Sequence, residues 1–235
     1  MWIVNKKSFA VGLVMSLGFW IVLAIMFSPV FGGLNAFEAA DRLFNSIAKG
    51  SSYRIEELRQ ANRKYEGAAF QAEVTLKDAE LTGKAQNLIT KAGAGFQGGN
   101  GNLQVRGDLG ALLAKALNDA DLMFNDRGKE VAAQYGYPEK EALFVWWTVL
   151  KEIQKDFQRQ QKFREASHLE EVLMKGVEVG YNFYGIETKR ASTNMVMLTA
   201  SLLFYILYTL WWGYAILWVF EGLGLQMKAS ARKEV

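Results

Sequence analysis

Two long stretches of this 235-residue chain contain no Lys, Arg, Asp or Glu, and they constrain its fold more than any other feature. They cover positions 8–37 and 191–220. A helix needs about 20 consecutive apolar residues to cross the roughly 30 Å of hydrocarbon in a bilayer. Both stretches are long enough, so the sequence excludes an ordinary soluble globule and predicts a membrane protein with two transmembrane helices.

The first predicted span covers residues 9–31 and follows a short tail, residues 1–8, that contains Lys6 and Lys7. A cleaved signal peptide also begins with basic residues, but its apolar core is usually about 7–15 residues long. The apolar run here extends from Phe9 to Phe31 and is longer than that core. We therefore favour a retained membrane anchor over a cleaved signal.

The second predicted span covers residues 191–220 and is rich in aromatic side chains. Indole N–H and phenol O–H groups inside a bilayer still need hydrogen-bond partners. We therefore expect part of this helix to face another protein, and we predict that Trp211, Trp212 and Trp218 bind that partner. The alternative is that lipid simply tolerates these rings.

Basic residues lie between each predicted span and the nearer chain terminus: Lys6, Lys7, Lys228, Arg232 and Lys233. Basic flanks favour the cytoplasmic side, so we expect both termini, including the tail 221–235, in the cytoplasm. Lys189 and Arg190 oppose this orientation, but charge bias carries little weight for loops longer than about 60 residues. The sequence thus predicts a two-pass protein of a bacterial inner membrane, with residues 32–190 in the periplasm.

The periplasmic region is predicted to consist of long helices, since Pro29 and Pro138 are the only prolines in the chain. Apolar residues follow a 3,4 alternation from Ser51 to Ala92, which is typical of a coiled coil. Asn62 occupies a seam position of that stripe, where we expect it to contact a partner helix. The fold class that we predict is therefore an all-α membrane protein, with two transmembrane helices flanking an extended, coiled-coil-like helical hairpin or bundle.

Three further helices complete this prediction: Leu34–Lys49, Leu109–Asp126 and a long returning segment, Glu139–Tyr184. Residues 93–108 are rich in glycine and are expected to form the distal turn. In the returning segment, Gly176 and Gly180 would allow another helix to approach closely.

Two short motifs are weak candidates for chemistry. Gly93, Gly95 and Gly98 match the GxGxxG pattern of dinucleotide sites, but the expected helix before them does not provide the strand that such a site requires. Ser46 and Lys49 match the SxxK spacing of serine acyl-transfer enzymes without the companion motifs. We interpret the first as a flexible turn and the second as a solvated helix end.

Cysteine is absent and His168 is the only histidine, which excludes thiol chemistry and multi-histidine metal sites within one chain. Glu165 and His168 share the ExxH spacing of di-iron bundles, but those sites need the motif twice. We favour an ion-paired surface face over a mononuclear metal site or one shared between subunits. The sequence therefore predicts no cofactor, no metal and no enzymatic activity.

Trp146 and Trp147 are adjacent, so on a helix their side chains point about 100° apart. We expect one of them in the core and the other either packed under a loop or anchoring a protein contact. Both are kept as candidate partner-binding residues.

Positions 38–190 carry equal numbers of basic and acidic residues, which argues against a nucleic-acid partner.

These features predict a non-enzymatic accessory or scaffold subunit of a bacterial inner-membrane protein complex. Its partners would be the lipid bilayer and other membrane or periplasmic subunits, or a second copy of the chain. Contacts would involve the aromatic second span and the periplasmic helices. The alternative function is a periplasmic sensory input subunit that signals through a separate partner.

Overall fold

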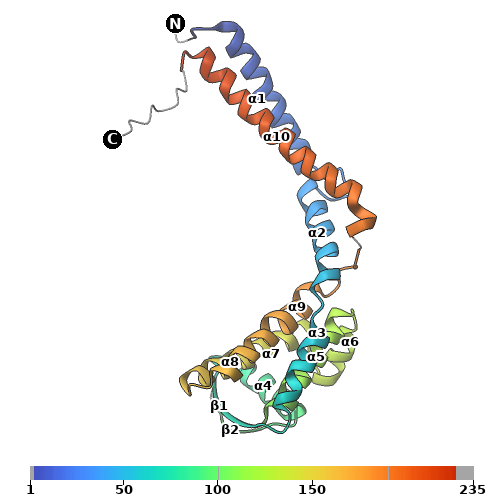
Figure 1. Cartoon of the computed structure of the whole chain (residues 1–235), viewed down its shortest axis with the longest axis vertical. Helices are drawn as coiled ribbons and strands as arrows, with labels where there is room; N and C mark the ends of the chain where they lie inside the picture. Colours follow the sequence, from blue (N-terminus) through green and yellow to red (C-terminus); the bar gives the residue numbers. More distant parts are fainter. Residues whose placement is uncertain (1–2, 100, 190, 226–235) are drawn as a thin grey trace, which may run out of the picture. The chain divides into compact units, whose positions relative to one another are not determined.

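The computed structural model describes residues 3–99, 101–189 and 191–225 (Figure 1). These residues divide into two compact units, one within Met1–Phe44 and Lys189–Val235, and the other within Asn45–Thr188. The two units are described separately below.

The first unit contains two helices that are long and apolar enough to cross a membrane, α1 (Lys6–Phe27) and α10 (Met195–Gly222). They lie side by side and run antiparallel, since the backbone N–H of Val4 donates to the carbonyl of Gly222 at 2.9 Å (Figure 1). Glycine permits this close packing: a Cβ at Gly12 would lie 2.5 Å from the backbone nitrogen of Val219. The prediction of two such helices is confirmed.

The ends of both helices differ from the predicted ones for local reasons. Asn5 caps α1 by accepting hydrogen bonds from the backbone N–H groups of Lys7 and Ser8. The helix ends at Phe27 because Pro29 holds the preceding Ser28 in an extended conformation. A short 3₁₀ turn, η3 (Ala191–Asn194), precedes α10.

Helix α2 (Ala36–Ser52) begins in the first unit and continues into the second. Asn35 and Glu38 form a reciprocal capping box: each side chain accepts a hydrogen bond from the backbone N–H of the other, at 2.9 and 3.0 Å. The predicted helix at 34–49 is therefore confirmed with shifted ends.

The second unit contains a three-stranded antiparallel sheet, which corrects the all-α prediction. Its strands are β1 (Ala69–Thr75), β2 (Gly95–Gly99) and β3 (Asn102–Asp108), in the order β1-β3-β2. Val105 of β3 pairs with Ala72 on one side and Phe96 on the other. Side chains of β1 alternate between exposed and buried, because one face of the sheet packs on the core.

The predicted continuous helix from Ser51 to Ala92 is wrong. The chain instead forms α3 (Ile55–Asn62), the 3₁₀ turn η1 (Arg63–Tyr65), β1 and α4 (Ala79–Lys91). Gly67, with φ of +76°, lies in the turn before β1, and Asp78 caps α4 through the N–H of Glu80. The apolar stripe is divided among two helices and a strand, so it is not a coiled-coil seam within this chain. The predicted distal turn at 93–108 forms the β2–β3 hairpin.

The remaining helices of this unit are α5 (Leu109–Phe124), α6 (Gly128–Tyr135), α7 (Glu139–Arg159), α8 (Phe163–Val172), the π-helical turn η2 (Leu173–Val177) and α9 (Glu178–Phe183). The predicted helix at 109–126 is confirmed. The predicted segment 139–184 is divided at a tight turn where Gln161 has φ of +61°.

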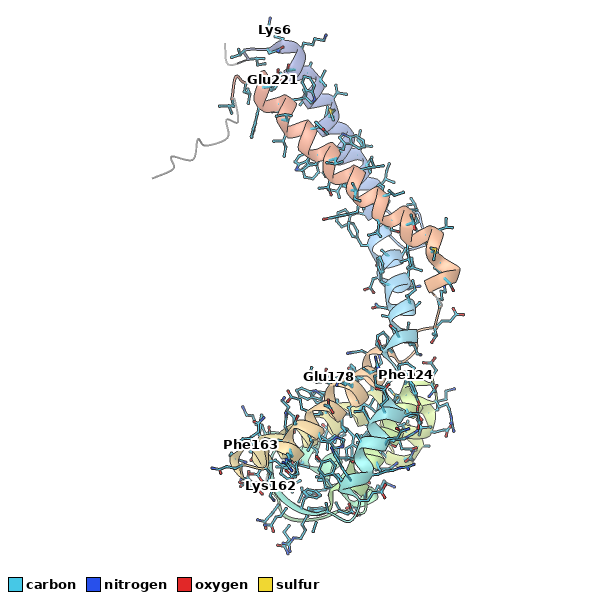
Figure 2. The ribbon with its side chains drawn as sticks, viewed as in Figure 1. Lys6, Phe124, Lys162, Phe163, Glu178 and Glu221 are labelled. Atoms are coloured by element: carbon cyan, nitrogen blue, oxygen red, sulfur yellow. The ribbon has the colours of Figure 1, made fainter. Side chains whose placement is uncertain are left out.

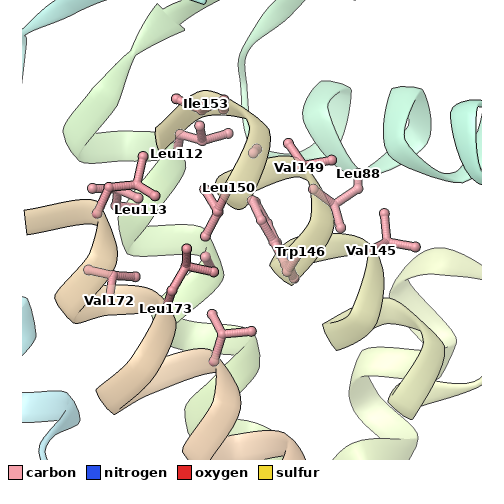
Figure 3. Close-up of a cluster of buried hydrophobic side chains, with 14 of the residues drawn as sticks. Leu88, Leu112, Leu113, Val145, Trp146, Val149, Leu150, Ile153, Val172 and Leu173 are labelled. Carbon is pink, nitrogen blue, oxygen red and sulfur yellow. The ribbon is translucent and has the colours of Figure 1, made fainter. Parts of the chain in front are cut away.

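One hydrophobic core holds this unit together, and α7 supplies its centre (Figure 3). Trp146 and Leu150 of α7 lie among side chains of α5 and of the α8–η2 segment. The sheet packs on the other end of α7, where the rings of Phe70 and Phe157 meet edge to face, 6.0 Å apart. This core fixes α8 next to η1, which positions the groove described below.

Candidate functional site

The second unit has an open groove between η1 and α8, with a volume of about 670 Å³. Its lining combines aromatic, basic and acidic side chains: Lys64, Tyr65, Phe163, Arg164, Glu165, Ser167, His168 and Glu171. Figure 2 labels Phe163 at the beginning of α8. The groove brings the predicted ExxH pair, Glu165 and His168, together with residues more than ninety positions earlier in the chain.

His168 is held in one tautomer by Asn62. The side-chain nitrogen of Asn62 donates to the carbonyl of Gly110 at 2.7 Å, which leaves its oxygen facing His168. That oxygen lies 3.3 Å from Nε2 of His168, so Nε2 must carry the proton and donate. Nδ1 of the neutral ring is therefore a hydrogen-bond acceptor.

The imidazole of His168 is only 5% exposed and stacks on the ring of Tyr65, with centroids 4.6 Å apart. Burial lowers its pKa below the usual value, and the neighbouring Lys64 ammonium lowers it further. His168 is therefore neutral at pH 7. The expectation that it belongs to an ion-paired surface face is wrong, because the packing of α8 against α3 and η1 buries the ring.

The charged groups of the groove are largely without ion pairs. Glu171 is paired with Lys175 at 2.9 Å. Lys64, Arg164 and Glu165 form no ion pair with any residue that the structure describes. The described residues contain no group of three or more His, Asp or Glu side chains that would hold a metal ion. The groove thus offers charges of both signs, an imidazole acceptor and two aromatic rings.

Asn62 and Trp146, both predicted to contact a partner, are buried within this chain. Asn62 is the residue that orients His168, as described above. Trp146 has no exposed surface, and its Nε1 donates to Asp119 at 2.9 Å. Neither side chain presents a surface to another protein, so Trp146 is the core member of the tryptophan pair.

Trp147 lies at the edge of the core and is partly buried. Its Nε1 donates to Glu178 of α9 at 2.8 Å. One turn away, Phe144 exposes its ring to solvent. The partner-binding role of Trp147 stays a prediction.

The SxxK pair is not a solvated helix end. Lys49 is only 3% exposed, and its ammonium donates to Asp126 at 3.1 Å and to the carbonyl of Ile186 at 2.7 Å. It also lies 5.2 Å from the centre of the Phe124 ring. Lys49 therefore ties α2 to the end of α5 and to the segment after α9.

The GxGxxG glycines lie in a turn and in β2, so no helix begins at them.

The aromatic side chains of α10 fall into two groups. Tyr208 and Trp211 face α1 and donate to the carbonyls of Phe19 and Met15 at 3.0 and 3.1 Å. Trp212 packs on the same helix, 4.4 Å from the ring of Phe19. Tyr205 and Trp218 instead have exposed side chains. The rings of α10 thus partly serve the contact with α1 and partly remain uncovered.

Tyr205 is the most exposed of the uncovered aromatic residues on α10, at 67%. Its hydroxyl makes no hydrogen bond with any residue that the structure describes. The sequence predicts an aromatic second span, but position along the helix alone does not show which of its rings face α1.

No family model, curated protein or solved structure matches this chain. Its functional interpretation therefore depends on the geometry of the described residues.

Proposed function

We propose that this chain is a two-pass protein of a bacterial inner membrane and a non-enzymatic accessory or scaffold subunit of a membrane complex. In this proposal α1 and α10 span the bilayer, both termini lie in the cytoplasm, and residues 32–190 lie in the periplasm. Its partners are other membrane or periplasmic subunits, or a second copy of the chain.

The observation that carries the proposal is the uncovered hydroxyl of Tyr205. Tyr205 is the eleventh residue of the 28-residue α10, about 15 Å from its beginning at 1.5 Å per residue. The midpoint of this helix is about 21 Å from its beginning, so in a spanning helix Tyr205 lies inside the hydrocarbon layer, about 6 Å from its middle. A polar group without a hydrogen-bond partner at this depth costs several kcal/mol.

Tyr208 and Trp211 show how α10 avoids this cost on its other side. Both donate to carbonyl groups of α1, so these two polar groups on the α1 side of the helix have hydrogen-bond partners. Tyr205 lies outside that contact. A neighbouring transmembrane helix with an accessible carbonyl or hydroxyl would supply the missing acceptor, and we propose that such a helix belongs to the partner.

Site-specific photo-crosslinking in intact cells tests this proposal. A photoreactive phenylalanine derivative replaces Tyr205 in one variant and Leu210, an exposed apolar residue of the same helix, in a control. The proposal predicts a defined protein adduct from position 205 and little from position 210. Equal labelling of lipid from both positions, with no protein adduct, would contradict it.

A second candidate function, the sensory input subunit, is favoured by the groove beside His168. Such a subunit needs a ligand site in its periplasmic region. The groove combines buried imidazole, charged and aromatic groups in the region that the proposed topology places outside the cytoplasm. It is consistent with a subunit that both binds a ligand and contacts a separate partner.

A further inference from the structure

We propose that the groove beside His168 binds a free α-amino acid with an apolar or aromatic side chain. The ligand's ammonium group would contact Nδ1 of His168 and Glu165, and its carboxylate would contact Lys64 and Arg164. Its side chain would cover Phe163. This inference goes beyond the proposed membrane subunit and does not depend on any protein partner.

The first step is the free acceptor of His168, a residue that lines the groove. The contact between Nε2 and Asn62 is the only hydrogen bond that His168 makes with the described residues. Every enclosed polar side-chain atom in the described part of the chain has a partner. Nδ1 has none, so it must be accessible, and the groove is the space that His168 lines. A ligand that donates an N–H would complete the bonding of the ring.

The second step is the charge of the side chains that line the groove together with His168. Lys64 and Arg164 are basic, Glu165 is acidic, and none of the three has an ion pair among the described residues. A simple anion would be repelled by Glu165, and a simple cation would be repelled by the two basic groups. A zwitterion satisfies both sets, with charge-assisted hydrogen bonds at each end.

The third step is the aromatic surface. Phe163 is 65% exposed at the beginning of α8 (Figure 2). Tyr65 provides the other ring of the groove. Exposed rings beside a few polar groups are typical of small-molecule sites, whose volumes are about 300–1,000 Å³. The groove has a volume of about 670 Å³, which accommodates an amino acid the size of phenylalanine. An apolar ligand side chain would remove the Phe163 ring from water.

The single histidine provides a direct readout. The full chain is prepared in lipid nanodiscs with ¹³C- and ¹⁵N-labelled histidine, and any purification tag is removed so that one imidazole signal remains. L-phenylalanine is the probe. We expect a saturable shift of this signal, with the ¹⁵N spectrum retaining the tautomer protonated at Nε2.

Two analogues test the zwitterion. The probe 3-phenylpropionate lacks the ammonium group, and phenethylamine lacks the carboxylate. Each should bind at least about tenfold more weakly than L-phenylalanine, the effect expected for losing a charge-assisted contact. Equal binding of either analogue, or no saturable shift up to the solubility limit of L-phenylalanine, would overturn the proposal.

Surface variants complete the test without disturbing the buried ring. Glu165→Gln and Arg164→Gln should each weaken L-phenylalanine binding about tenfold. Lys129→Gln removes an exposed charge outside the groove and should leave binding unchanged. If all three variants bind equally, the groove is not the site. Crosslinking at position 205 is independent of these results, so the two proposals can fail separately.

Discussion

The indole Nε1 of Trp146 donates a 2.9 Å hydrogen bond to Oδ2 of Asp119, and neither side chain has exposed surface. The hydroxyl of Tyr135 donates to the same oxygen, and the ammonium of Lys115 donates to Oδ1 at 2.8 Å. Burial and the neighbouring carboxylate raise the pKa of Tyr135, which keeps its hydroxyl protonated. One buried carboxylate thus joins α5, α6 and α7.

Replacing this carboxylate should destabilise the second unit strongly. Asp119→Ala leaves the indole and phenol donors buried without an acceptor, so we expect a loss of about 3–5 kcal/mol in unfolding free energy. Asn118→Ala changes an exposed residue of the same helix and should stay within about 0.5 kcal/mol of the parent. Chemical unfolding of the full chain in detergent micelles, followed by circular dichroism, measures both. Equal effects of the two variants would show that the Asp119 contacts contribute little.

Two glycines should respond to alanine in opposite directions. A Cβ at Gly180 of α9 would lie 2.6 Å from the carbonyl oxygen of Ala120, so Gly180→Ala should cost about 1–3 kcal/mol of stability. Gly83 lies within α4 and has open space around it. Gly83→Ala should therefore stabilise the protein by about 0.5–1 kcal/mol, because alanine loses less backbone freedom. Opposite shifts in the unfolding midpoint are expected, and shifts of the same sign would contradict this packing.

Protonation of His168 should weaken the fold in mildly acidic solution. Its pKa in the folded chain is lowered, mainly by burial, below the 6.5 of an unperturbed histidine. The unfolded chain therefore binds the proton first, and stability is lost as pH falls below 6.5, by at most about 1.4 kcal/mol per pH unit for one proton. Carboxylates such as Glu171, whose pKa lies below 4.5, titrate in a lower window.

The control for this pH effect is His168→Gln, which retains an N–H donor for Asn62 and does not titrate. Unfolding free energies measured between about pH 7.5 and pH 5 should fall for the parent and stay nearly flat for this variant. Parallel profiles for the two proteins would assign the pH dependence to other groups.

The buried Lys49 should stabilise the segment that follows α9. Lys49→Met removes the donor to Ile186 and to Asp126, so we expect a loss of roughly 1–3 kcal/mol. The variant Lys175→Met breaks an exposed ion pair with Glu171 and should cost less than about 1 kcal/mol. Hydrogen exchange at residues 184–187 should accelerate in the first variant and not in the second. The same exchange rate in both would show that Lys49 does not hold this segment.

The sequence predicts the two long apolar helices and α5 well. An uninterrupted apolar run, or apolar residues that recur at helical spacing over many positions, is compatible with few other structures. The close approach at Gly176 and Gly180 is also confirmed, since a Cβ at either position would meet α5. The sheet was missed because the period-2 pattern of β1 at Phe70, Ala72 and Val74 shares residues with a 3,4 stripe. A glycine at position 67 before that pattern was the signal for a break.

The candidate site was only partly predictable. The ExxH spacing identified Glu165 and His168 as a pair, but their neighbours Lys64 and Tyr65 come from an element about a hundred positions away. Contacts between residues so far apart in the sequence depend on tertiary packing, which local sequence patterns do not show. The same limit explains Asn62: its seam position predicted burial against another helix, and the residue that it meets, His168, belongs to this chain.

Native mass spectrometry of the chain extracted from its own membrane in mild detergent tests the central claim most directly. We predict a defined assembly heavier than the 26.4 kDa of one chain, and a lighter or weaker assembly for Tyr205→Phe, which removes only the hydroxyl. A homogeneous 26.4 kDa species for both proteins would contradict the proposed role as a subunit.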